Sequence, residues 1–71
     1  MEHTIEITTP FIKLEALLKY AGLVGTGGES KNRIADGEVL VNGEVCTQRG
    51  RKLRPGDRVE MEGETLLVAE A

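Results

Sequence analysis

Two stretches of this sequence carry residue types that bind anions, and the first reads GTGGESKNRI. Thr26 and Glu29 have the spacing of a capping box, which predicts a helix that begins at Gly27. The first N–H groups of a helix lack partners inside it and carry partial positive charge, so phosphate binds there readily. Gly27 and Gly28 have no side chains and would let a ligand approach this helix start closely. Lys31, one turn further on, would add a full positive charge.

This glycine-rich stretch does not match the motifs that bind nucleotides. The phosphate-binding loop of nucleotide hydrolases has a lysine directly after its last glycine, and no glycine of this chain is followed by lysine. The dinucleotide fingerprint follows a strand, whereas a helix is expected before this stretch. Two interpretations stay open for the glycines: close packing of a second helix, or close approach of an anion.

The second stretch reads RGRKLRPGD and concentrates positive charge. Arg49, Arg51, Lys52 and Arg54 fall within six positions that hold no acidic residue, and Leu53 is expected to anchor the segment to the core. The segment is either a solvated loop or a multi-point phosphate contact, in which guanidinium groups bind phosphate through two N–H groups.

The charge and aromatic content narrow the class of ligand. The chain has a net charge of −3, yet residues 31–58 hold seven basic and four acidic residues. A ligand on this segment would meet a local positive field, because salt screens more distant charges. Phe11 and Tyr20 are the only large aromatic residues, which argues against a protein that stacks single-stranded bases. Recognition of the shape and backbone of folded RNA suits the composition better.

Two helices are expected to position these residues. The first is predicted over residues 10–21, with Thr9 as its N-cap, Pro10 at the first helical position and Gly22 as its stop. The second is predicted over residues 27–36 and ends at Gly37.

Strands are expected before and after the two helices in the sequence. Alternation predicts a first strand over residues 4–8, and EVLVNGEVCT predicts a hairpin that turns at Asn42-Gly43. A two-residue turn would place Val45 opposite Leu40, whereas a bulge at Gly43 would regroup the valines, so the register stays open. The next predicted elements are a type II turn over residues 54–57 and strands over 57–62 and 64–70. The fold class is therefore α+β, with two helices packed on a small antiparallel sheet. Its core is expected to be aliphatic and to contain Ile5, Ile7, Leu14, Leu17, Leu18, Ile34, Val39, Val41, Val45, Leu53, Val59, Leu66 and Val68.

The bulk properties fit one small cytoplasmic domain over residues 1–71. Cys46 is the only cysteine, so no internal disulfide can form, which suits a reducing compartment. No apolar run reaches the length of about 20 residues that spans a bilayer, and the N-terminus lacks the pattern of a signal peptide. His3 is the only histidine and no residues have metal-ligand spacing, so we expect no enzyme, no cofactor and no metal site.

Several motifs, in order, resemble the S4 RNA-binding domain, which is named after a small-subunit ribosomal protein. The first helix of that family has an Arg-Leu-Asp-x-x-Leu pattern, which Lys13-Leu14-Glu15-x-x-Leu18 matches with like charges. The chain also has Ile34-Ala-Asp-Gly37, Val39-Leu-Val41-Asn42-Gly43 and Gly56-Asp57 at the corresponding places, so the resemblance covers residues 11–62. Two positions depart from the family: Thr26-Gly27 replaces Ser-Arg, and Arg33 stands where an apolar residue is usual. The sequences of both basic stretches are similar to those of the stand-alone bacterial subgroup, in which this domain is the entire protein.

The resemblance implies a non-catalytic, ribosome-associated protein that binds structured RNA, either ribosomal or transfer RNA. We also expect a monomer with no membrane partner and no small-molecule substrate. The residues it assigns to RNA binding are Lys13, Thr26, Gly27, Gly28, Lys31, Arg49, Arg51, Lys52 and Arg54. Two alternatives remain open from the residues: a protein-interaction adaptor, and a β-grasp sulfur carrier, although such carriers end in Gly-Gly and this sequence ends in VAEA.

Overall fold

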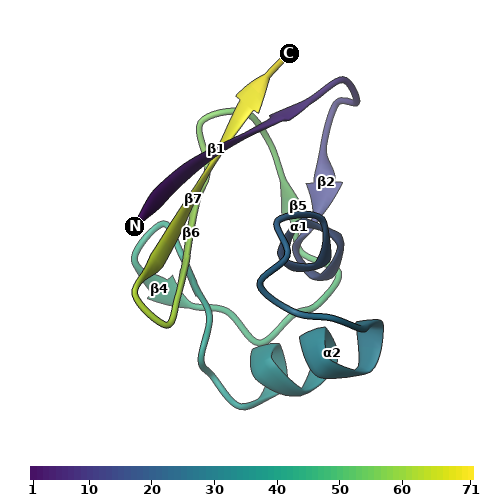
Figure 1. Cartoon of the computed structure of the whole chain (residues 1–71), viewed down its shortest axis with the longest axis vertical. Helices are drawn as coiled ribbons and strands as arrows, with labels where there is room; N and C mark the ends of the chain where they lie inside the picture. Colours follow the sequence, from purple (N-terminus) through teal and green to yellow (C-terminus); the bar gives the residue numbers. More distant parts are fainter.

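The computed structural model describes residues 1–71 and has two helices, a five-stranded sheet and a separate two-stranded sheet. The elements along the chain are β1 (Glu2–Ile7), β2 (Ile12–Lys13), α1 (Leu14–Tyr20), α2 (Gly27–Ala35), β3 (Leu40–Val41), β4 (Glu44–Val45), β5 (Lys52–Leu53), β6 (Arg58–Met61) and β7 (Glu64–Glu70). Both helices and the β2–β5 pair lie on one side of the larger sheet, to the right in Figure 1. This arrangement confirms the α+β fold class. Neither helix is long and apolar enough to cross a membrane.

The five-stranded sheet is mixed, with the order β1-β7-β6-β3-β4. All of its pairs are antiparallel, as expected, except that β1 runs parallel to β7, from Glu2 opposite Thr65 to Ile7 opposite Glu70. A parallel pair requires a long connection between its strands, and here the rest of the domain supplies that connection. Local patterns cannot reveal a pairing between the two ends of a chain.

Helix α1 begins later than its sequence pattern predicts. Residues 10–13 are not helical, because Ile12 and Lys13 pair with β5 as strand β2. The predicted N-cap, Thr9, instead donates a hydrogen bond from its hydroxyl to the Phe11 carbonyl. The helix ends at Tyr20, one residue before the predicted end, and Gly22 is the predicted stop: its N–H donates to the Lys19 carbonyl.

Helix α2 begins where the capping box predicts. The Glu29 N–H donates to Thr26 Oγ1 over 3.1 Å, which confirms Thr26 as the N-cap. The Glu29 carboxylate differs from the standard motif, since it accepts a hydrogen bond from the Gly25 N–H at 2.9 Å. The chain then turns at Gly37, whose N–H donates to the Ile34 carbonyl.

The hairpin has the two-residue turn and not the bulge. Asn42 and Gly43 both have positive φ, 52° and 87°, as a tight hairpin turn requires. Leu40 therefore pairs with Val45, whose side chain is 60% exposed. The prediction that Val45 belongs to the core was wrong, because this register sends Val41 and Val45 to opposite faces of the sheet.

The core lies between the larger sheet and the helices. Leu14, Leu17 and Leu18 of α1 are completely buried, and so is Leu53 of β5. Three members of the core are absent from the predicted list, namely Val24, Cys46 and Met61. Ile5, which was predicted to be in the core, is only half-buried. The expected type II turn is present, since Gly56 has a φ of 102° and the Asp57 N–H donates to the Arg54 carbonyl.

Candidate nucleic-acid interface

The Glu15 backbone joins the two basic stretches. Its N–H donates to the Arg49 carbonyl over 3.1 Å, and its own carbonyl accepts a hydrogen bond from the Ser30 hydroxyl at 3.2 Å. One residue earlier, the Leu14 N–H donates to the Arg51 carbonyl. Ser30 is completely buried and belongs to the first turns of α2. Hydrogen bonds of the Glu15 backbone therefore connect the start of α1 both to the first turns of α2 and to the arginine-rich segment.

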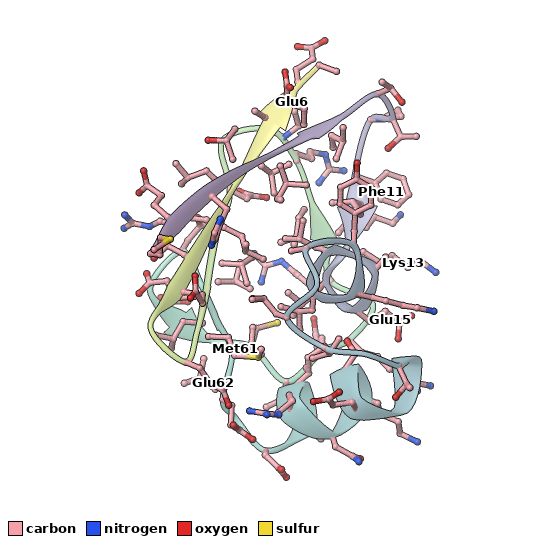
Figure 2. The ribbon with its side chains drawn as sticks, in the orientation of Figure 1. Glu6, Phe11, Lys13, Glu15, Met61 and Glu62 are labelled. Atoms are coloured by element: carbon pink, nitrogen blue, oxygen red, sulfur yellow. The ribbon has the colours of Figure 1, made fainter.

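Strand pairing brings two of the predicted cations directly opposite each other. Lys13 of β2 and Lys52 of β5 are register partners, and both side chains are exposed. Like charges opposite each other in a strand pair are unfavourable unless something compensates them. Part of the compensation comes from Phe11, whose ring centroid lies 4.9 Å from Lys52 Nζ in a cation–π contact. Figure 2 shows Phe11 and Lys13 along the same edge of the molecule, beside α1.

A shallow cavity of about 300 Å³ separates the exposed side of α1 from the start of α2. Glu15, Ala16 and Lys19 line it from α1, and Gly27 lines it from α2. Lys31 is four residues after Gly27 and so lies on the same side of α2. We define the cationic surface as Lys13, Lys31, Arg49, Arg51 and Lys52.

The two glycines at the start of α2 do not make room for a packed helix. A Cβ atom at Gly27 would meet nothing within 4 Å, and one at Gly28 would lie 3.9 Å from the Thr26 hydroxyl. Helix α1 instead contacts α2 through Ser30, one turn further along. Of the two interpretations, close helix packing is therefore not supported, and the start of α2 is open on the side of Gly27.

The basic residues divide into paired and unpaired groups. The chain has nine lysines and arginines, and only Arg33 and Arg58 make ion pairs within it. The other seven have no carboxylate partner: Lys13, Lys19, Lys31, Arg49, Arg51, Lys52 and Arg54. All seven side chains are exposed, so they are free to meet an anion.

Arg33, where the sequence departs from the family pattern, is held by carboxylates. Its guanidinium donates hydrogen bonds to Glu62 and, over 3.0 Å, to Glu38, while Glu29 lies 3.8 Å away. The hydrogen bond to Glu62 is the largest cause of a pKa raised above the usual arginine value, and the bond to Glu38 adds to it. Arg33 therefore links the flank of α2 to the β6–β7 turn and is not available to a phosphate.

Two basic residues lie at the margins of the cationic surface. Arg54 is in the proline turn after β5, where its backbone N–H donates to Asp57, and the adjacent Pro55 lines a cavity with Thr9 and Pro10. This turn lies at the end of β5 that points away from α2 (Figure 1). Lys19, which sequence analysis did not select, lines the cavity opposite Gly27. The sequence could have indicated Lys19, because it stands four residues after Glu15 and so lies on the side of α1 away from the buried leucines.

The residues that could support catalysis or bind a metal have other roles. His3 makes a 2.8 Å contact with the Glu64 carboxylate on the exposed sheet, and Cys46 is buried in the core. No group of three histidine, cysteine or acidic side chains is arranged to hold a metal ion.

Comparison with known proteins identifies the family. The S4 domain family matches residues 5–69. The chain is 46% identical over 63 residues to the probable ribosome maturation protein RlbA of Bacillus subtilis, and the match covers 89% of each protein. It is also 39% identical over 57 residues to ribosomal large subunit pseudouridine synthase B of Xanthomonas campestris and of Xanthomonas axonopodis. Those matches cover 80% of this chain but only 11% and 10% of the two enzymes. Because the family match covers nearly all of its length, this chain belongs to the S4 domain family of RNA-binding domains.

Proposed function

We propose that this protein binds structured RNA through the phosphate backbone and catalyses no reaction. Its RNA is ribosomal or transfer RNA, and it acts in the cytoplasm as a monomer. The contact residues are the cationic surface together with Thr26, Gly27, Gly28 and Arg54.

The observation that carries this proposal is the division of the basic residues. An arginine that already binds carboxylates, such as Arg33, would have to give up those contacts before it could bind phosphate. The five residues of the cationic surface have no such partners. Lys13 and Lys52 also repel each other across the β2–β5 pair, and a bound anion would relieve that repulsion.

The arrangement suits a backbone contact better than the reading of base edges. The arginines can each bind a phosphate through two N–H groups, and the open start of α2 offers further N–H donors beside Lys31. Contacts of this kind fix where and how a domain sits on RNA but carry little sequence information. A folded RNA presents phosphates in a fixed spatial pattern, which a rigid set of cations can match.

The relatives support a role on ribosomal RNA without supporting catalysis. The Bacillus subtilis protein, which this chain matches over nearly its full length, is named as a ribosome maturation protein. The pseudouridine synthases share only about a tenth of their length with the chain, so their activity does not transfer to it.

The test is to crosslink the protein to RNA in growing bacterial cells and to sequence the attached RNA. We expect ribosomal or transfer RNA to be enriched over messenger RNA, and a K13Q/R51Q/K52Q variant to recover little RNA. The matched control is R58Q, because Arg58 is exposed but lies on β6 in an ion pair with Glu60. Equal recovery of RNA by the triple variant and the wild type would contradict the proposal.

A further inference from the structure

Tyr20 has an exposed aromatic side chain that belongs neither to the core nor to the cationic surface. It is 71% exposed, at the end of α1, and its hydroxyl makes no hydrogen bond within the chain. With Ile12 it lines a surface cavity of about 260 Å³. The rest of the lining comes from the end of β1 and the residues after it, Glu6, Ile7, Thr8 and Thr9.

This cavity lies beside β2, the strand that carries Lys13. Ile12 stands between Phe11 and Lys13 in the chain, and its register partner Leu53 directly follows Lys52. Tyr20 itself directly follows the unpaired Lys19. The two large aromatic residues of the chain therefore both lie beside β2, where an RNA backbone would cross Lys13 and Lys52.

We propose that an unpaired base of the bound RNA enters this cavity and stacks on the ring of Tyr20. The inference rests on the proposed function, because the backbone contacts bring the base to the cavity. Base stacking on an aromatic side chain is the usual way in which proteins hold unpaired nucleotides. The low aromatic content had argued against stacking, but position matters more than number when a single base is bound.

The polar lining selects the base and excludes a phosphate. The Glu6 carboxylate makes no ion pair or hydrogen bond within the chain, and it would repel a phosphate from the cavity. It can accept hydrogen bonds only, so it favours a base edge that presents N–H donors. Guanine presents two adjacent donors, at N1 and N2, which match the two oxygens of a carboxylate. The occupant is therefore an unpaired guanine.

Tyrosine fluorescence reports on this site alone, because the chain has one tyrosine and no tryptophan. The probes are two RNA hairpins with the same stem, one with a bulged guanosine and the other with an abasic residue at that position. At low salt both hairpins bind through their backbones, and we expect only the bulged guanosine to quench the emission, after correction for RNA absorbance. Replacing the bulged guanosine by uridine should weaken both binding and quenching.

Variants separate stacking from other roles of Tyr20. Y20A should weaken binding of the bulged hairpin by about 5- to 150-fold, whereas Y20F, which keeps the ring, should bind it within about twofold of the wild type. E6Q should reduce the preference for guanosine over uridine. None of the three should change the affinity for the abasic hairpin.

Failure of this site is distinguishable from failure of the proposed function. If both hairpins bind, the quenching is equal and Y20A binds like the wild type, the base site is overturned while backbone binding stands. If neither hairpin nor total bacterial ribosomal RNA binds, both inferences are overturned.

Discussion

Neutralising Arg51 and Lys52 should lower both the affinity for RNA and its dependence on salt. Both side chains are exposed, and neither makes an ion pair within the chain. The Arg51 carbonyl, which accepts the hydrogen bond from Leu14, belongs to the backbone and survives the substitution. An R51Q/K52Q variant should therefore fold normally, with a change in unfolding free energy of at most about 0.5 kcal/mol.

The size of the salt effect follows from the number of cations on the surface. If each of the five neutralises one phosphate, log affinity should fall with log salt at a slope of about −3.5 to −4.5. Between 50 and 200 mM salt, this slope corresponds to a loss of roughly 130- to 500-fold. With three cations left the slope should be about −2.1 to −2.7, and the loss over the same range roughly 20- to 40-fold.

The assay is fluorescence anisotropy of a labelled bacterial ribosomal RNA fragment, titrated at several salt concentrations. R51Q and R58Q form a matched pair, since each removes one exposed arginine and changes the net charge equally. R51Q should reduce the slope by about 0.7 to 0.9, and R58Q should leave it unchanged. Equal slopes for R51Q, R58Q and the wild type would mean that Arg51 contacts no phosphate.

Three further changes test the supporting structure. S30A removes the partly buried hydrogen bond to the Glu15 carbonyl and should cost about 1 kcal/mol, or roughly 4–8 °C in melting temperature. N32A, on the exposed side of α2, should cost less. L18A should cost about 2–5 kcal/mol, and since a chain of this size has roughly 4–11 kcal/mol of stability, circular dichroism should show it partly unfolded near 37 °C. R33Q should lower the melting temperature but leave RNA affinity unchanged; a loss of affinity without a loss of stability would contradict the role given to Arg33.

The pH dependence of the Arg33 contacts has a definite sign. Hydrogen bonds to Glu62 and Glu38 raise the pKa of Arg33, so the folded state holds this proton more tightly than the unfolded state does. The resulting stabilisation is fully present below the ordinary arginine pKa and is lost only as the pH rises through the raised value. Titration of Arg33 should therefore cause no change in melting temperature between pH 6 and pH 9.

Local signals in the sequence predicted the second helix and the turns correctly. The capping box placed the start of α2 at Gly27, and Asn42-Gly43 placed the hairpin turn, because these preferences depend on neighbouring residues only. The start of α1 was wrong for the opposite reason. Ile12 and Lys13 are drawn into a strand by Leu53 and Lys52, about forty residues away in the chain, and no local pattern reports such a pairing.

The candidate site was likewise predictable only where neighbouring residues in the sequence determine it. Charge clustering pointed to the arginine-rich segment, and the motif of the first helix pointed to Lys13. Only the fold shows that Lys13 faces Lys52 and that the Glu15 backbone ties both basic stretches together. The cavity beside Tyr20 was equally hidden, because it forms where the end of β1 meets the end of α1.

The most direct test of the central claim is an amide NMR spectrum of the protein, recorded as ribosomal RNA fragments are added. We expect shift changes at Lys13, Gly27, Lys31 and Arg51, which lie around the shared Glu15 junction. Amides on the outward face of β6 and β7, such as those of Glu60 and Thr65, should keep their shifts. Changes confined to that outward face, with none at Lys13 or Arg51, would mean that RNA binds elsewhere on the protein.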